Sequence, residues 1–457
     1  MENRYENIII GFGKGGKTLA GTLAAAGQST ALIEKDPGMY GGTCINVACI
    51  PTKSLENSAR LSAAMGGGFG EKAERYAAAV AEKRRLTGML RGKNLDKAVS
   101  AGVKVLTGAA SFVDSHTVRV TDADGNAEEL VGERIFLNTG SRPFMPPIPG
   151  LKDSRFVYTS ETLMERDQLP RRLAIIGGGY IGLEFSSYFS NFGSEVTVIQ
   201  DGEAFIPRED AEIAQAVYEN LTARGIKILR AAKTLSVRDG DGCAVLTVAS
   251  GGAEQELEAD AVLAAVGRRP NLEGLNTAAA GIALTERGAV KTDEHLRTSV
   301  PHIWAMGDVV GGLQFTYISL DDFRIVKSAI LGDGSRTTAN RGEVPYTVFL
   351  DPPMSRVGLS EAEAAAKGLD YRIARLPAAA IPKAQVLKKT AGLLKAVVDA
   401  KTDRILGAHF FCAESQEMIN LVKLCMDAGL PYTVLRDSIY NHPTMTEALN
   451  DLFAAVK

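Results

Sequence analysis

Two cysteines five positions apart, Cys44 and Cys49, carry the strongest chemical signal in the sequence. They follow the run Gly41-Gly42-Thr43 and precede Pro51-Thr52-Lys53. A disulfide between them requires a distorted helix start, which the preceding glycines permit. A helix N-terminus also favours the thiolate and lowers a thiol pKa. Structural zinc sites pair cysteines at shorter spacing with two further ligands nearby. None is evident, so we expect no metal here, and the pair is either redox-active or two unrelated thiols of a helix.

The first of two glycine-rich turns lies in residues 7–34, where an apolar strand, a turn, an Ala-rich helix and a second strand follow one another. Gly11 permits the tight turn, Gly13 lets the backbone approach a pyrophosphate, and Gly16 allows close packing of helix and strand. The pyrophosphate then lies at the helix N-terminus, where free N–H groups favour negative charge. Glu34 ends the second strand and can accept from a ribose hydroxyl. The segment therefore predicts a dinucleotide site.

The same plan returns in residues 173–200, whose turn contains Gly177, Gly179 and Gly182. This unit ends at Gln200, and a neutral glutamine neither holds a ribose diol as firmly as a carboxylate nor repels a 2′-phosphate. Arg208 could pair with such a phosphate or could belong to a solvated loop. The two units predict two dinucleotide domains, and the choice between NADH and NADPH stays open.

The remaining segments predict how these sites are held. Residues 55–100 are rich in Ala, Glu, Lys and Arg and indicate long helices, whereas residues 103–138 alternate as strands do. A Pro-rich connector at 143–150 leaves the first domain, and the strand 261–266 ends the second. From about residue 340, strands and helices mix, which favours an α+β third domain. The fold class is therefore α/β, with two doubly wound Rossmann-like domains and a C-terminal α+β domain.

Composition excludes several classes of protein. The chain has 457 residues and a net charge of -3, so it is large enough for several domains and offers no basic surface for nucleic acid. No stretch approaches the roughly 20 apolar residues of a membrane span. The polar N-terminus, Met1 to Asn7, is no secretory signal, and five scattered cysteines form no disulfide framework. We expect a cytoplasmic protein in which Cys243, Cys412 and Cys425 are core residues.

Residues 41–53, with the pattern Gly-Gly-Thr-Cys-x-Asn-x-x-Cys-x-Pro-Thr-Lys, resemble the active-site signature of the class I pyridine nucleotide–disulfide oxidoreductases. That family includes glutathione reductase, lipoamide dehydrogenase and mercuric reductase. Three further segments, 139–143, 305–308 and 442–447, are similar to its later motifs, so the resemblance covers the whole chain. It implies an NAD(P)H-dependent flavoprotein with FAD as its second cofactor.

The resemblance also implies a role for each residue around the cysteine pair. Cys44 would be the exchange thiol that meets the oxidant, and Cys49 would lie against the flavin as the charge-transfer thiolate. Lys53, paired with Glu184, would lie near flavin N5, where hydride arrives. Tyr180 would gate the nicotinamide pocket.

A histidine near the C-terminus completes the implied site. His442, oriented by Glu447, would come from the partner subunit of a homodimer and move a proton for Cys44. An imidazole held by a carboxylate has a basicity close to that of a thiolate, as such a transfer requires. A monomer would then lose disulfide-dependent turnover.

The family pattern assigns the cofactor contacts as well. FAD would contact the first turn, the cysteine loop and two later segments, through Gly11, Gly13, Gly16, Glu34, Gly42, Thr43, Lys53, Thr139, Gly140, Gly307 and Asp308. NAD(P)H would contact Gly177, Gly179, Gly182, Gln200, Arg208 and Gly267. The FAD domain would be discontinuous, giving 1–148 and 271–338 for FAD, 149–270 for NAD(P) and 339–457 for dimerisation.

The oxidant is the open question. Residues 8–14, 39–44, 312–322 and 441–443 are most similar to the bacterial reactive-chlorine-resistance branch of the family, which implies a small oxidant such as hypothiocyanous acid, or Cu(II). A lipoamide dehydrogenase of a 2-oxo acid dehydrogenase complex and a mercuric reductase-like metal reductase are the alternatives, although residues 449–457 lack a cysteine pair. A metal-binding or redox-sensing module would leave both nucleotide folds without a purpose. One departure is Ala48, where the family has glycine.

Overall fold

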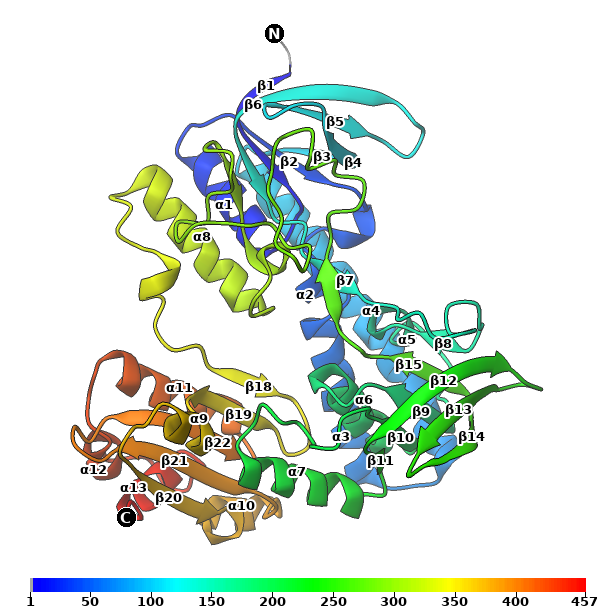
Figure 1. Ribbon diagram of the computed structural model, residues 1–457, viewed down its shortest axis with the longest axis vertical. Coiled ribbons are helices and arrows are strands. Elements are labelled where there is room, and N and C mark those ends of the chain that lie inside the picture. The colour runs from blue at the N-terminus through cyan, green and yellow to red at the C-terminus, as the bar shows by residue number, and fades with distance from the viewer. Residues whose placement is uncertain (1–2) are drawn as a thin grey trace.

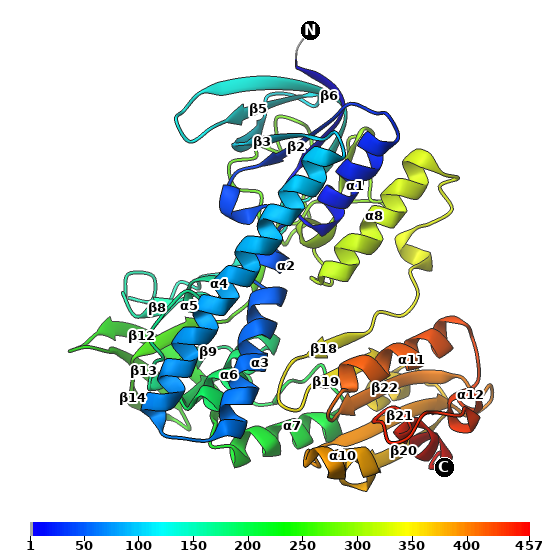
Figure 2. The same cartoon turned by 180° about the vertical axis from the view of Figure 1, so that it is seen from behind.

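The computed structural model describes residues 3–457 and divides into three lobes (Figures 1 and 2). The first lobe is built on a sheet in the order β3-β2-β1-β6-β5-β4, with β17 paired to β6. Its strands are β1 (Arg4–Ile10), β2 (Thr30–Glu34), β3 (Lys104–Thr107), β4 (Ala109–Phe112), β5 (Thr117–Thr121), β6 (Ala127–Leu137) and β17 (Ile303–Ala305). β1 runs parallel to β2 and β6, and its residues Ile8 to Ile10 are buried, as the strand of a sheet covered on both faces should be.

Helices cover this sheet and carry the cysteine pair. α1 packs against α8, while α2 and α3 follow one another directly and α3 lies along α4. Their bounds, with the short 3-10 turns, are α1 (Lys14–Ala25), η1 (Pro37–Met39), α2 (Thr43–Asn46), α3 (Cys49–Met65), α4 (Phe69–Ser100), η2 (Gly307–Val310) and α8 (Thr316–Leu331). The blue helices α3 and α4 cross from the first lobe to the second (Figure 2).

The second lobe repeats the doubly wound plan. Its parallel sheet has the order β11-β10-β9-β15-β8, and an antiparallel sheet, β12-β13-β14, lies beside it. The two-stranded ribbon of β7 and β16 joins the first two lobes (Figure 1). The bounds are β7 (Ser141–Pro143), β8 (Val157–Tyr158), α5 (Ser160–Leu163), β9 (Arg172–Ile176), α6 (Tyr180–Phe192), β10 (Glu195–Ile199), α7 (Ala211–Ala223), β11 (Lys227–Leu229), β12 (Ala232–Asp239), β13 (Ala244–Ser250), β14 (Ala253–Ala259), β15 (Ala261–Ala264) and β16 (Arg268–Pro270).

The third lobe is an antiparallel sheet, β18-β19-β22-β21-β20, with helices around it. Its elements are η3 (Thr338–Asn340), β18 (Tyr346–Val348), β19 (Met354–Gly358), α9 (Glu361–Ala366), β20 (Tyr371–Pro377), η4 (Ala378–Ala380), α10 (Pro382–Leu387), β21 (Leu393–Asp399), β22 (Ile405–Phe411), α11 (Ser415–Asp427), α12 (Thr433–Asp437) and α13 (Ala448–Ala454). The predicted α/β fold class with an α+β third domain is confirmed. The long helices expected in 55–100 are α3 and α4, and the strands expected in 103–138 are β3 to β6.

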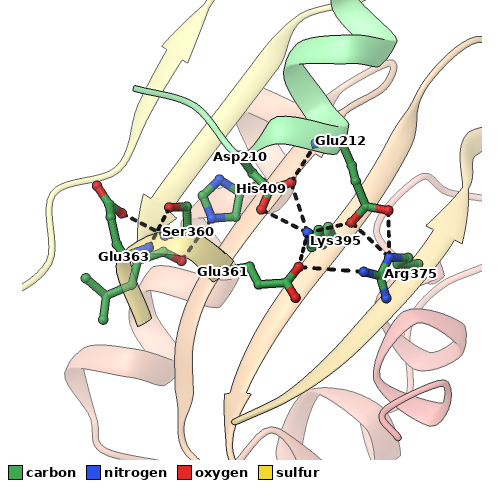
Figure 3. Close-up of polar contacts among 9 residues, drawn as sticks. Asp210, Glu212, Ser360, Glu361, Glu363, Arg375, Lys395 and His409 are labelled. Atoms are coloured by element: carbon green, nitrogen blue, oxygen red, sulfur yellow. Dashed lines mark hydrogen bonds and ion pairs between the residues drawn. The ribbon is translucent and has the colours of Figure 1, made fainter. Parts of the chain in front are cut away.

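A cluster of charged side chains joins the third lobe to the second (Figure 3). Lys395 of β21 is only 2% exposed, and its ammonium lies 2.9 Å from Asp210, 2.5 Å from Glu212 and 2.6 Å from Glu361. His409 of β22 is buried beside it, and burial lowers its pKa to about 4, so its imidazole is neutral at pH 7. Lys395 is therefore the central cation of the cluster.

Replacement of Lys395 by methionine should lower the free energy of unfolding by about 3–5 kcal/mol, because the buried carboxylate of Asp210 would lose its counter-ion. Urea unfolding followed by circular dichroism measures this change. The matched control is Lys401→Met, since Lys401 is an exposed lysine of the same lobe. Equal stability of the two variants would show that Lys395 contributes no more than a surface cation.

Candidate active site

One large cavity, of about 2130 Å³, lies where the three lobes meet. Both glycine turns line it, and so do Cys44, Cys49 and Asp308. Its volume exceeds the roughly 300–1,000 Å³ of an ordinary small-ligand site, as a site for two dinucleotides requires. The structure thus brings most of the predicted cofactor residues to one cavity.

The first glycine turn is fixed by Asn138, which follows β6. Gly11 has a φ of +101°, and a Cβ there would lie 2.4 Å from the Asn138 carbonyl oxygen, so only glycine fits. A Cβ on Gly13 would lie 2.3 Å from Oδ1 of Asn138. That oxygen accepts from the Gly16 amide at 2.8 Å, while Nδ2 donates to the Met306 carbonyl at 2.7 Å. Asn138 was missed by the sequence reasoning because no local pattern marks it.

The remaining predicted FAD residues lie around this turn. Glu34 accepts from the Phe12 amide at 3.0 Å, and burial raises its pKa. Gly42, with a φ of +83°, touches the turn so closely that a Cβ would lie 2.7 Å from the Gly13 Cα. Asp308 accepts from the Ser141 hydroxyl at 2.7 Å, and burial raises its pKa.

Two features fit this cradle to a dinucleotide. Among residues 3–457, the buried hydroxyl of Thr139 has no hydrogen-bond partner, so it is free to bind a ligand. Gly11, Gly13 and Gly42, which have no side chains, are among the residues that line the cavity. Thr43, Lys53 and Gly140 line the same cavity, so these residues could hold FAD.

The cysteine pair lies between two helices. Cys44 belongs to the short α2, and Cys49 is the first residue of α3, with its Sγ 3.5 Å from the Thr316 hydroxyl of α8. A hydrogen bond from Cys44 lowers the pKa of Cys49 to about 6, and the same bond raises the pKa of Cys44. From the sequence, we predicted only the helix start as a cause of a lowered thiol pKa. In the structure, the hydrogen bond from Cys44 is the largest cause of the lowered Cys49 pKa. Ala48, between the helices, has a φ of -139°, outside the left-handed region that demands glycine.

The reduced pair should therefore titrate as a unit, with thiolate absorbance at 240 nm rising around pH 6. Cys44→Ala removes the donor, so the midpoint for Cys49 should move up toward the ordinary thiol range. Cys243→Ala serves as the control, because Cys243 is buried elsewhere and should leave the midpoint unchanged. A midpoint that stays near 6 in Cys44→Ala would assign the shift to the helix or to Lys53 instead.

Lys53 and Glu184 meet as predicted, with Nζ 2.5 Å from Oε2. The other oxygen of Glu184 accepts from the Phe349 amide at 2.8 Å, and the Lys53 ammonium lies 4.4 Å from the centre of the Phe349 ring. Tyr180, one turn before Glu184 on α6, donates its hydroxyl to Glu209. Phe349 thus contacts both Lys53 and Glu184, an arrangement that the sequence alone could not predict.

The second glycine turn has room for phosphate at the start of α6. A Cβ on Gly177 would meet the Ala265 carbonyl at 2.5 Å, and one on Gly182 would meet the Gly177 carbonyl at 2.1 Å, so both glycines are needed for packing. Gly179 is the N-cap of α6 and has no atom within 4 Å of its Cβ position. The free N–H groups at this helix start are suited to a phosphate. Gly267, with a φ of +122°, lines the same cavity.

Gln200 and Arg208 differ in how ready they are to bind. The Gln200 side-chain nitrogen donates to Gly202 at 2.9 Å and to Ala204 at 2.7 Å, so it is committed to its own loop, whereas Oε1 of Gln200 is buried without a hydrogen-bond partner within residues 3–457. Arg208 is exposed and lines the cavity, so it remains available for a phosphate.

His442 and Glu447 pair but do not reach the cysteines within one chain. His442 Nδ1 lies 2.8 Å from Glu447 Oε2, and the pairing lowers the pKa of Glu447. The imidazole is 69% exposed and lies outside the cavity lining. α12 and α13, which flank it, lie on the far side of the third lobe from α2 (Figures 1 and 2). Within one chain, His442 therefore lies apart from Cys44.

Comparison with known proteins identifies the class that this fold and site define. The family described as pyridine nucleotide-disulphide oxidoreductase matches residues 5–322, and its dimerisation domain matches residues 344–453. The chain belongs to this family and is an NAD(P)H-dependent flavoprotein disulfide reductase that uses FAD. No helix within residues 3–457 has both the length and the apolar character to cross a membrane.

Individual relatives match at least 97% of this chain. The chain is 47% identical over 456 residues to the probable pyridine nucleotide-disulfide oxidoreductase RclA of Escherichia coli K12, and the match covers 100% of both. A mercuric reductase of Staphylococcus aureus is 34% identical, over 97% of this chain and 81% of that protein. A dihydrolipoyl dehydrogenase of Mycobacterium tuberculosis is 33% identical, over 98% and 97%.

Solved structures agree. The HOCl-induced flavoprotein disulfide reductase RclA from Escherichia coli, at 47% identity, has a TM-score of 0.93 over 99% of this chain and 100% of that one. The Cu(II) complex of the same protein has a TM-score of 0.94 and covers 100% of both chains. The predicted likeness to the reactive-chlorine-resistance branch is therefore confirmed.

Proposed function

We propose that this protein uses NAD(P)H to reduce a small electrophilic oxidant, with hypothiocyanous acid as the first candidate, through Cys44 and Cys49. The observation that carries the proposal is the paired thiols at the cavity, one with a lowered pKa, in a chain similar to an HOCl-induced reductase. A compact oxidised sulfur needs only access to a thiolate and no extended binding cleft.

The oxidant is reduced in two steps at the cysteine pair. Cys44 gives up its thiol proton, and the resulting thiolate attacks the sulfur of HOSCN, forming an S–S bond and releasing hydroxide, which takes up that proton to become water. The Cys49 thiolate then attacks the Cys44 sulfur, forming the protein disulfide and releasing thiocyanate. FAD, when bound, carries two electrons from NAD(P)H to this disulfide and restores both thiols. The cycle needs NAD(P)H, so we place the enzyme in the cytoplasm.

The other residues have supporting roles in this proposal. Lys53, held by Glu184, places a positive charge beside the cysteine pair. His442 of the partner subunit, held by Glu447, exchanges the proton with Cys44 in a homodimer with shared active sites. Arg208 favours a dinucleotide that carries a 2′-phosphate.

Two alternatives rest on the relatives. Cu(II) is a second candidate oxidant, because the RclA structure was solved as a Cu(II) complex. Dihydrolipoamide and Hg(II) are the substrates to test for the lipoamide dehydrogenase-like and mercuric reductase-like readings, since both relatives are over 30% identical.

The test is stopped-flow oxidation of the NAD(P)H-reduced protein by a panel of oxidants. We expect hypothiocyanous acid to reoxidise the protein at least about tenfold faster, as a second-order rate constant, than Cu(II), glutathione disulfide or lipoamide. Titration with NADH and NADPH fixes the coenzyme in the same preparation. A faster reaction with lipoamide would overturn the proposal in favour of a dihydrolipoyl dehydrogenase.

A further inference from the structure

Glu209 is a buried carboxylate between two tyrosines of different lobes. It is 7% exposed, and its Oε1 accepts from the Tyr180 hydroxyl of α6 and, at 2.7 Å, from the Tyr346 hydroxyl of β18. The two tyrosine rings lie 5.7 Å apart, centre to centre. Its Oε2 is buried without a hydrogen-bond partner within residues 3–457. Burying an incompletely paired carboxylate is costly, so its hydrogen bonds to the two phenols are expected to be strong.

Arg208 and Asp210, the residues on either side of Glu209, are both held by the third lobe. Arg356 of β19 donates to the carbonyl of Arg208. Asp210, which caps the N-terminus of α7, pairs with the buried Lys395, as Figure 3 shows. Three consecutive residues, 208 to 210, are thus each fixed by a different strand of the third lobe. The backbone that carries Glu209 has little freedom to move.

Phe349, which follows β18, contacts the residue one helical turn after Tyr180 on α6. Tyr180 and Glu184 lie one turn apart on α6. Glu184 accepts from the Phe349 amide, and Tyr180 reaches Tyr346 through Glu209. The segment 346–349 therefore sets the position of both side chains relative to the cavity.

We propose that Glu209 is a positioning residue for Tyr180 and holds the tyrosine ring as a fixed wall of the nicotinamide part of the cavity, in place of the moving gate that the family resemblance implies. This rests on the proposed function and on the contact between Tyr180 and the nicotinamide that the family resemblance implies. A wall that is ordered before binding spares the dinucleotide the entropy cost of ordering it. Burial, followed by the Glu209 charge, raises the pKa of Tyr180 to about 12, so its hydroxyl stays a donor at neutral pH.

A double-mutant cycle tests the proposal through binding of oxidised NAD⁺ and NADP⁺, measured by fluorescence titration without oxidant or turnover. Glu209→Leu should raise the dissociation constant about three- to tenfold, the cost of ordering one side chain. In a Tyr180→Phe background, the same substitution should change it by less than about twofold, because the hydroxyl is already gone. Glu209→Gln keeps an acceptor and should recover most of the affinity.

Glu219→Leu is the matched control, since Glu219 is an exposed carboxylate on α7. If Glu209→Leu does not fold, the cycle runs with Glu209→Gln, whose smaller effect must likewise vanish beside Tyr180→Phe. An unchanged or lowered dissociation constant, or an equal effect in both backgrounds, would overturn the proposal. Failure of the oxidant reaction would show in the stopped-flow panel and leave this binding result intact, so the two outcomes are separable.

Discussion

Replacement of Cys44 by serine is expected to abolish reduction of the oxidant by NAD(P)H, with a loss on the order of 10³-fold or more. A serine hydroxyl is not ionised near neutral pH, so no nucleophile remains to attack the oxidant. Reduction of bound FAD by NAD(P)H should persist, because the dinucleotide cavity does not depend on this sulfur. Anaerobic absorbance titration followed by addition of hypothiocyanous acid measures both halves of the reaction.

The matched control is Cys243→Ser, a buried cysteine of the second lobe, which should keep full turnover. Continued turnover in Cys44→Ser would transfer the oxidant chemistry from the thiol to FAD itself. The redox role proposed for the cysteine pair would then be wrong.

Replacement of His442 by alanine is expected to slow the oxidant reaction by about 10²- to 10⁴-fold, the range of a lost acid–base group. In one chain this imidazole lies outside the cavity that contains Cys44, so any effect on the thiol must come from a second subunit. The rate of oxidation by hypothiocyanous acid measures the loss, while reduction by NAD(P)H should stay normal. Glu447→Gln should give a smaller loss, because the amide still orients the ring.

Mixed dimers decide whether the histidine acts across the interface. Cys44→Ser and His442→Ala are each expected to be strongly impaired, but a dimer of one with the other contains one intact site, with Cys44 from the His442→Ala subunit and His442 from the Cys44→Ser subunit. Turnover should therefore return when the two variants are unfolded, mixed and refolded together. No recovery in confirmed mixed dimers would place both groups in the same subunit and refute the shared site.

Local sequence was enough for the fold class and the family. The turns around Gly11 and Gly177 combine strand, glycine and helix within about thirty residues, so neighbouring residues alone specify a dinucleotide unit. Gly11 and Gly177 have positive φ angles, +101° and +111°. Side chains disfavour such angles, so glycine is required at both turns, as the sequence pattern predicts. The spacing of Cys44 and Cys49 is equally local.

The partners that hold these residues could not be read in the same way. Asn138 fixes the first turn from the end of a distant strand, and Glu209 contacts Tyr180 of its own lobe and Tyr346 of the third lobe. Such contacts depend on how the lobes pack, and no periodicity in the chain encodes them. The roles of Lys53, His442 and the other site residues remain predictions that the variants above test.

The pairing of β17 with the carboxyl end of β6 has a consequence for synthesis on the ribosome. Ile135, Phe136 and Leu137 pair with β1 on one side, but they gain their partner on the other side only when Ile303 to Ala305 emerge, after the entire second lobe has been made. Until then the nascent chain exposes an apolar, unpaired strand edge, the kind of surface that recruits other chains. Translation that stalls after β16 should therefore release an aggregation-prone fragment and not a folded N-terminal half.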